Sequence, residues 1–159
     1  MTVTEMGQRR MRDGLRPGLT ATMTYTVPPE RTVPNLLPES AEFAALPNVL
    51  ATGYLVGIVE WTCIRAIAGQ LDDAERTLGI HVDLSHEGPT PPGADLTVSV
   101  ELVSVEGRRL TFSVRASDDA GVVCKGTHER AVIDIARFTD RLAARTGGRS
   151  DGQVEAAGH

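Results

Sequence analysis

The longest apolar run of the chain is residues 51–71, ATGYLVGIVEWTCIRAIAGQL, and it carries one carboxylate, Glu60, near its middle. A run of this length without proline is too long for a buried strand and predicts a long helix. Because charged side chains interrupt it, we do not interpret it as a membrane span. We therefore expect the rest of the chain to pack around this helix.

The expected helix has two unlike sides when its residues are spaced at about 100°. The predicted solvent face consists of Thr62, Arg65, Gly69 and Asp72. Glu60 projects from the opposite side, which it shares with Gly53 and Gly57. A glycine inside a helix costs about 1 kcal/mol relative to alanine, so these two indicate that a strand or a partner's helix packs close to the backbone.

A carboxylate on the buried side of a helix must be paired, protonated or used in chemistry, because an isolated buried charge is too costly to keep. Glu60 therefore has two interpretations: a functional carboxylate in a mostly apolar setting, or half of a salt bridge with an arginine. Thr52 also has two interpretations: a functional hydroxyl, or a cap of the helix, because it stands where a hydroxyl would cap it. The residues themselves leave both alternatives open.

Alternating apolar and polar residues predict strands on both sides of the helix in the sequence. Residues 19–27 form the first, and a proline-rich segment, residues 30–49, should be a loop with short helical turns. After the helix, residues 77–86 carry an apolar row that ends at His86 and points this imidazole toward the helix. Residues 96–102 and 110–116 form a hairpin with a turn at Glu106-Gly107, followed by a strand over 122–135 and a terminal helix over 136–145.

One strand, one long helix and then an antiparallel meander of four strands predict an α+β protein whose sheet curls around the helix, which is the hotdog architecture. Its sheet has about five strands and leaves an edge that can pair across a two-fold axis, so we expect a homodimer. We assign residues 1–18 to a flexible N-terminal segment, 19–145 to the single domain and 146–159 to a flexible tail.

The composition excludes several classes of protein. A net charge of −5 without a basic run gives no case for nucleic-acid binding. The N-terminus lacks the apolar region of a signal peptide, and we expect no membrane partner. The 2 cysteines are too few for a disulfide scaffold, and the 4 histidines show no metal-ligand spacing. We therefore expect a cytoplasmic protein with no metal and no other cofactor.

The sequence resembles the fluoroacetyl-CoA thioesterase family of hotdog proteins from Arg12 to about Phe138. The matching motifs are MRDGLRPG, VPPERTV, LPESAEF, ATGYLVGIVEW, LGIHVDLSH, TPPG, SVEGRRL and GTHERAVI. The resemblance implies that Thr52, Glu60 and His86 are catalytic. It also implies that Gly79 and Arg130 contact the substrate, although an arginine there can equally form a structural ion pair.

The resemblance also implies a lid over the acyl pocket with two phenylalanines. This chain has Phe43 at the first position and Leu46 at the second. A branched aliphatic side chain excludes water differently from an aromatic ring, so we expect a short acyl group other than fluoroacetyl.

The function expected from these residues is hydrolysis of a short-chain acyl-CoA. Glu60 acts as the base for water or as the nucleophile, Thr52 orients the carbonyl or water, and His86 assists Glu60 or protonates the leaving sulfur. Two alternatives come from other classes: an acyl-CoA-binding hotdog protein without catalysis, and an enoyl-CoA hydratase. The hydratase is disfavoured because it would need an aspartate and a histidine at a loop–helix junction, where this chain has threonine.

Overall fold

The computed structural model describes residues 13–147 and contains one five-stranded antiparallel sheet with the strand order β1-β3-β4-β5-β2. The strands are β1 (Thr20–Thr26), β2 (Glu75–Leu84), β3 (Asp95–Glu106), β4 (Arg109–Asp118) and β5 (Gly121–Asp134). The expected strands are therefore confirmed, as is the hairpin, whose turn contains Gly107 at φ +59°. Such a positive φ suits glycine because it has no Cβ to clash with the backbone.

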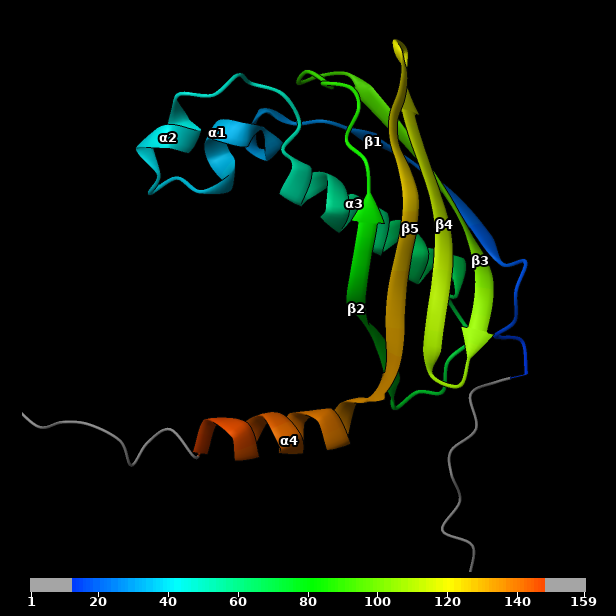
Figure 1. Ribbon diagram of the computed structural model, residues 1–159. Helices are drawn as coiled ribbons and strands as arrows, with labels where there is room; N and C mark the ends of the chain where they lie inside the picture. Colours follow the sequence, from blue (N-terminus) through cyan, green and yellow to red (C-terminus); the bar gives the residue numbers. More distant parts are fainter. Residues whose placement is uncertain (1–12, 148–159) are drawn as a thin grey trace, which may run out of the picture.

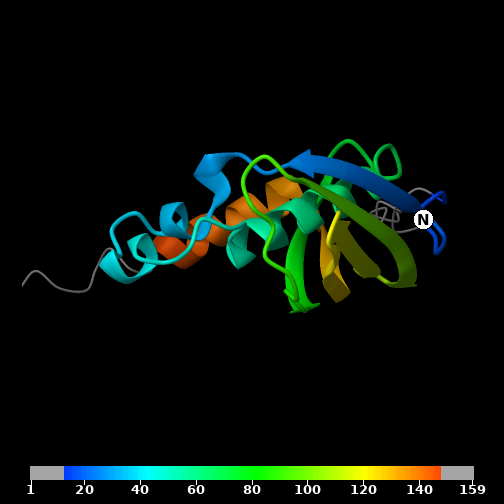
Figure 2. The same ribbon diagram turned by 90° about the horizontal axis from the view of Figure 1, so that it is seen from above.

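The long helix α3 (Thr52–Ala66) lies against one face of this sheet (Figure 1). The view from above shows the sheet curling around the helix from β1 to β2 (Figure 2). Leu55, Val59 and Cys63 on α3 are buried against the side chains of the strands, of which Phe112 is the largest that is fully buried. This arrangement confirms the expected α+β architecture.

The apolar side of α3 differs from the expectation. Thr62, predicted to face solvent, is fully buried, and its hydroxyl donates a hydrogen bond to the carbonyl of Ile58. The open side carries Trp61 and Ile64, which are 47% and 46% exposed. Arg65 and Gly69 are exposed as predicted. The prediction was wrong for Thr62, and it missed the apolar stripe that the single chain leaves uncovered, which a polarity pattern cannot anticipate.

Between β1 and α3 the chain forms a 3-10 turn (Pro29–Arg31), α1 (Val33–Leu36) and α2 (Ala41–Ala44), as expected for a loop with short helical turns. Leu36 on α1 packs over the start of α3, where a Cβ on Gly53 would lie 3.2 Å from it. Helices α1 and α2 extend away from the sheet, as does α4 (Ile135–Gly147) on the opposite end (Figure 1). No helix among residues 13–147 is long and apolar enough to cross a membrane.

Strand β2 lies at one edge of the sheet and contains a bulge between Gly79 and His81. Gly79 pairs with Arg130 and Val82 with His128, so the bulge changes which residues face the helix. The predicted single apolar row along this strand is therefore wrong. Leu78 and Ile80 are 40% and 47% exposed at the edge.

The expected boundaries at the chain ends stay predictions, because most of the two terminal segments lies outside the described residues. Within the N-terminal one, Leu15 is 7% exposed and belongs to the core.

Replacing Phe112 by alanine should lower the free energy of unfolding by about 3–5 kcal/mol, because it leaves a cavity between the sheet and α3. Urea unfolding followed by circular dichroism measures the change, with the exposed Leu142→Ala as the control expected to stay within about 0.5 kcal/mol. A loss below about 1 kcal/mol for Phe112→Ala would contradict this core assignment.

Candidate active site

Thr52 and His86 form the first of two polar clusters. The hydroxyl of Thr52 lies 2.7 Å from Nδ1 of His86, and either group can be the donor. The N-cap of α3 is Ala51, and no side chain caps the helix, so the capping interpretation of Thr52 is wrong. The prediction that His86 points toward the helix is confirmed.

The imidazole of His86 is suited to work as a neutral group. Burial lowers its pKa below the ordinary value, and the backbone of Gly88 opposes this shift only in part. Its Nε2 atom is buried and has no hydrogen-bond partner among residues 13–147. An unpaired buried polar atom is costly in a folded protein, so this one marks His86 as a candidate for a functional contact.

Glu60 and Arg130 form the second cluster. Oε2 of Glu60 accepts a hydrogen bond from Nη1 of Arg130 at 2.8 Å, in an ion pair whose arginine side chain is 3% exposed and whose glutamate side chain is 36% exposed. The setting of Glu60 is thus polar rather than mostly apolar, and the salt-bridge interpretation is confirmed. The ion pair orients the carboxylate, the group that a base or a nucleophile needs.

The guanidinium of Arg130 makes three further contacts with residues of the sheet. Nε donates to the hydroxyl of Thr77 and Nη2 to its carbonyl, both at 2.9 Å, and Nη1 lies 3.1 Å from Nε2 of His128. Sequence reasoning missed Thr77 and His128. The signal that could have found His128 is its position two residues before Arg130 on the same strand face.

Gly79 makes room for the ion pair. A Cβ at this position would lie 2.8 Å from Oε2 of Glu60 and 3.1 Å from the ring of His128. A side chain here would therefore have to displace the carboxylate of Glu60 from this position. Beside it, Glu60 and Gly79 line a groove of about 300 Å³ with His81, Val82 and His128 from the sheet.

The two clusters lie apart within one chain. Thr52 and Glu60 are eight residues apart on α3, a rise of about 12 Å along the helix. Thr52 and His86 therefore meet each other, and Glu60 meets Gly79 and Arg130, but one chain does not bring the predicted catalytic trio together.

The structure places Phe43 on α2 and Leu46 directly after it, on the segment that leads into α3. Phe43 is half-buried and Leu46 is 47% exposed. Their role as a lid stays a prediction.

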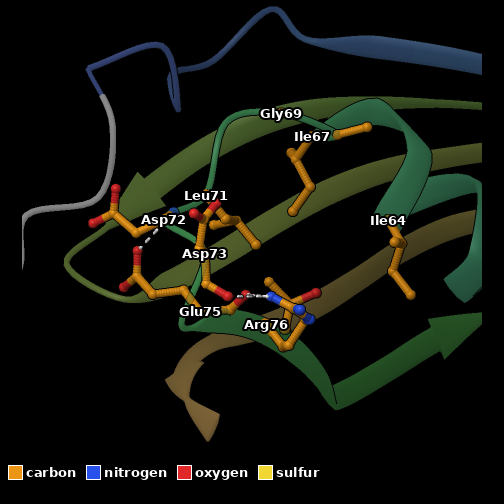
Figure 3. A pocket seen from close by; sticks show the side chains of 10 residues that line it. Ile64, Ile67, Gly69, Leu71, Asp72, Asp73, Glu75 and Arg76 are labelled. Atoms are coloured by element: carbon orange, nitrogen blue, oxygen red, sulfur yellow. Dashed lines mark hydrogen bonds between the residues drawn. The ribbon is translucent and has the colours of Figure 1, made fainter.

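A larger cavity, of about 510 Å³, lies at the C-terminal end of α3 (Figure 3). Ile64, Ile67 and Leu71 form its apolar side, and Asp72 and Asp73 lie on its acidic side. Acidic groups disfavour the phosphates of CoA, so we do not assign this cavity to the substrate.

The thiol of Cys63 is not a nucleophile at neutral pH. Burial raises its pKa to about 12, with a smaller opposing effect from Arg130. A thiol with such a pKa stays protonated and unreactive.

Known proteins are similar to this chain in both sequence and fold. The family model of the fluoroacetyl-CoA-specific thioesterases matches residues 28–136. The chain is 47% identical over 136 residues to a fluoroacetyl-CoA thioesterase of Streptantibioticus cattleyicolor, which covers 86% of this chain and 98% of that protein. A solved structure of fluoroacetyl-CoA thioesterase superposes with a TM-score of 0.81 at 47% identity, covering 84% of this chain and 98% of that one. A hot-dog-like protein from Thermanaerovibrio acidaminovorans gives a TM-score of 0.66 at 25% identity, covering 86% and 94%.

The sheet wrapped on one long helix is therefore the hotdog fold of the thioesterases, which are thioester hydrolases. More narrowly, the chain belongs to the fluoroacetyl-CoA-specific thioesterase family.

Replacing Gly79 by alanine should push the carboxylate of Glu60 off Arg130, because the new methyl group would overlap Oε2. We expect kcat/KM on an acyl-CoA to fall about 10- to 100-fold while the fold stays intact. Thiol release and circular dichroism measure the two effects. Ser113→Ala, on the exposed face of β4, is the control. An unchanged kcat/KM for Gly79→Ala would show that the close approach at this glycine is irrelevant to catalysis.

Proposed function

We propose that the protein is a cytoplasmic enzyme that hydrolyses a short-chain acyl-CoA to the free acid and CoA. The observation that carries this proposal is the pair of polar clusters. One presents a carboxylate paired with an arginine beside a groove, and the other a hydroxyl bonded to a half-buried imidazole whose pKa is lowered by burial. The two free, buried cysteines fit a reducing compartment.

The proposal includes a homodimer, because the single chain leaves apolar surface uncovered beside the site. Strand β2 has an unpaired edge with Leu78 and Ile80 exposed, and α3 exposes Ile64 beside β2 and Trp61 beside Tyr25 of β1. An unpaired strand with apolar side chains is a template for pairing with another chain. Pairing β2 with its copy across a two-fold axis would extend the sheet and cover this surface.

A two-fold axis at the β2 edge would also complete the site. It makes the two α3 helices antiparallel, so the N-terminal end of one helix lies beside the later half of the other. Thr52 and His86 of one protomer would then face Glu60 of the partner subunit, and each dimer would contain two composite sites. The acyl group would bind between the clusters, with Phe43 and Leu46 closing over it.

The hydrolysis follows from these groups. Glu60 removes a proton from water, which attacks the acyl carbon, or its carboxylate attacks directly and the resulting anhydride is hydrolysed. Thr52 and the first backbone N–H groups of α3 stabilise the oxygen that becomes negative. As the carbon–sulfur bond breaks, neutral His86 relays to the departing sulfur the proton that Glu60 took from water, so the ring ends neutral as it began. Arg130 holds the carboxylate of Glu60 in place, and Gly79 leaves the space beside that carboxylate.

The relative is a fluoroacetyl-CoA thioesterase, but this chain differs from the family at the lid position. With Leu46 where the family has a phenylalanine, we infer a short acyl group other than fluoroacetyl. A panel of short acyl-CoAs, including halogenated and branched ones, identifies it by the rate of thiol release.

Glu60→Ala should lower kcat by at least about 100-fold, because it removes the base or nucleophile. Glu60→Gln keeps the shape of the side chain and should give a similar loss. Thiol release from the best acyl-CoA measures both, with circular dichroism as the check on folding. Unchanged hydrolysis would reject the mechanism, whereas tight acyl-CoA binding by the wild type without any thiol release would favour the non-catalytic binder.

Mixing two inactive variants tests whether the sites are composite. In a hybrid of a Thr52→Ala protomer and a Glu60→Ala protomer, one site carries both changes and the other carries neither. Equal amounts mixed under conditions that exchange subunits should recover about a quarter of wild-type activity. If each chain held a complete site of its own, mixing would restore nothing.

A further inference from the structure

His128 lies at the centre of the second cluster and is fully buried. Its Nδ1 is 2.8 Å from the carbonyl oxygen of His81, and its Nε2 is 3.1 Å from Nη1 of Arg130. The first contact reaches the edge strand β2 at its bulge, and the second reaches the arginine that binds Glu60.

These two contacts fix the protonation state of the ring. A carbonyl oxygen only accepts hydrogen bonds, so Nδ1 must carry a proton. A guanidinium only donates, so Nε2 must be an unprotonated acceptor. His128 is therefore neutral, with its single proton on Nδ1, as long as both hydrogen bonds exist.

The four hydrogen bonds of the guanidinium form one connected unit. Thr77 accepts on one side, and His128 and Glu60 accept from Nη1 on the other. Nη1 carries two hydrogens, so the acceptor at His128 directs the second hydrogen toward Oε2 of Glu60. Without this acceptor the guanidinium would have an unpaired buried N–H and could turn away from the carboxylate.

We propose that His128 is a positioning residue, which orients Arg130 toward Glu60 and ties the β2 bulge to the same arginine. The role rests on the proposed function of Glu60, but the arrangement of the ring can be tested without any activity. His128 acts through Arg130 and contacts no reacting atom.

Protonation of His128 would break this unit, because Nε2–H would then face the N–H groups of Arg130. Burial lowers the pKa of His128 most, and Arg130 lowers it further. The carbonyl of His81 and the charges of Glu60 and Glu129 oppose the shift. The neutral ring therefore persists below the ordinary histidine pKa of 6.5. The unfolded chain takes up this proton at a higher pH than the folded chain. The contribution of His128 to the free energy of unfolding therefore decreases as the pH falls from about 6.5 toward the pKa of the folded state.

The first test is nuclear magnetic resonance of the full chain with ¹⁵N-labelled histidine. We expect the His128 ring to give the shifts of the neutral Nδ1–H tautomer at pH 7 and to titrate below 6.5. In Arg130→Ala its titration should move upward, because the neighbouring positive charge is gone. A neutral Nε2–H tautomer, or a titration that does not respond to Arg130→Ala, would overturn the proposal whether or not the protein is a thioesterase.

The second test is a double-mutant cycle on hydrolysis. His128→Phe keeps a buried ring but removes both hydrogen bonds, and we expect kcat to fall about 10- to 100-fold with KM close to that of the parent. In an Arg130→Ala background the same replacement should change kcat by less than about threefold. Additive effects of the two replacements would contradict action through Arg130.

Two further variants separate positioning from packing. His128→Gln offers an acceptor to Arg130 and a donor to the His81 carbonyl, so it should recover most of the kcat lost in His128→Phe. Phe112→Leu is a matched core control, because Phe112 pairs with His128 across β4 and β5 and is equally buried. At equal folded fraction, Phe112→Leu should keep the kcat of the parent. If it loses as much kcat as His128→Phe, or if His128→Gln recovers nothing, the role of His128 is packing alone.

Discussion

The constraint on which the site depends is the straight helix α3, which carries Thr52 at its start and Glu60 two turns later. The helix fixes the two residues about 12 Å apart along its axis, and each then finds its partner from a different part of the sheet. Thr52 meets His86 beyond the end of β2, whereas Glu60 meets Arg130 on β5. A reaction that needs both clusters at one acyl carbon therefore needs a second copy of the chain. The apolar side of α3 and the open edge of β2 are the surfaces that such a copy would cover.

The ion pair of Glu60 and Arg130 is expensive to build, because desolvation of a buried guanidinium must be offset by several well-placed acceptors. The sheet supplies them through Thr77, His128 and the bulge of β2. Bulges often lie next to active sites, where they redirect a side chain or a backbone group. Here the bulge exposes the His81 carbonyl to the ring of His128 and places Gly79 against the carboxylate. The bulge of β2 and the acceptors around Arg130 thus both help to position the carboxylate of Glu60.

The order of elements was predictable because each element has a clear local pattern in the sequence. These patterns are one apolar run for α3, alternation for the strands, and Glu106-Gly107 for the hairpin turn. The candidate residues were found partly from physics, since Glu60 interrupts an apolar run, and partly from resemblance, which supplied Gly79 and Arg130. The partner of Glu60 and the network around Arg130 were not predictable, because strand register decides which side chains meet. The bulge at Gly79–His81 shifts the register of β2, so residues after it that would face away from the helix by simple alternation face toward it, and the reverse. The exposed stripe with Trp61 and Ile64 was missed because pattern reasoning treats apolar residues as buried within one chain.

In the proposed dimer, two half-sites of different chains make one catalytic centre. A crystal structure of the protein with bound CoA tests it most directly. The account predicts that β2 pairs with its copy across a two-fold axis and that the sulfur of CoA lies between Thr52 and His86 of one protomer and Glu60 of the partner subunit. A structure in which the sulfur lies beside one cluster only, with the other cluster open to solvent, would contradict the claim.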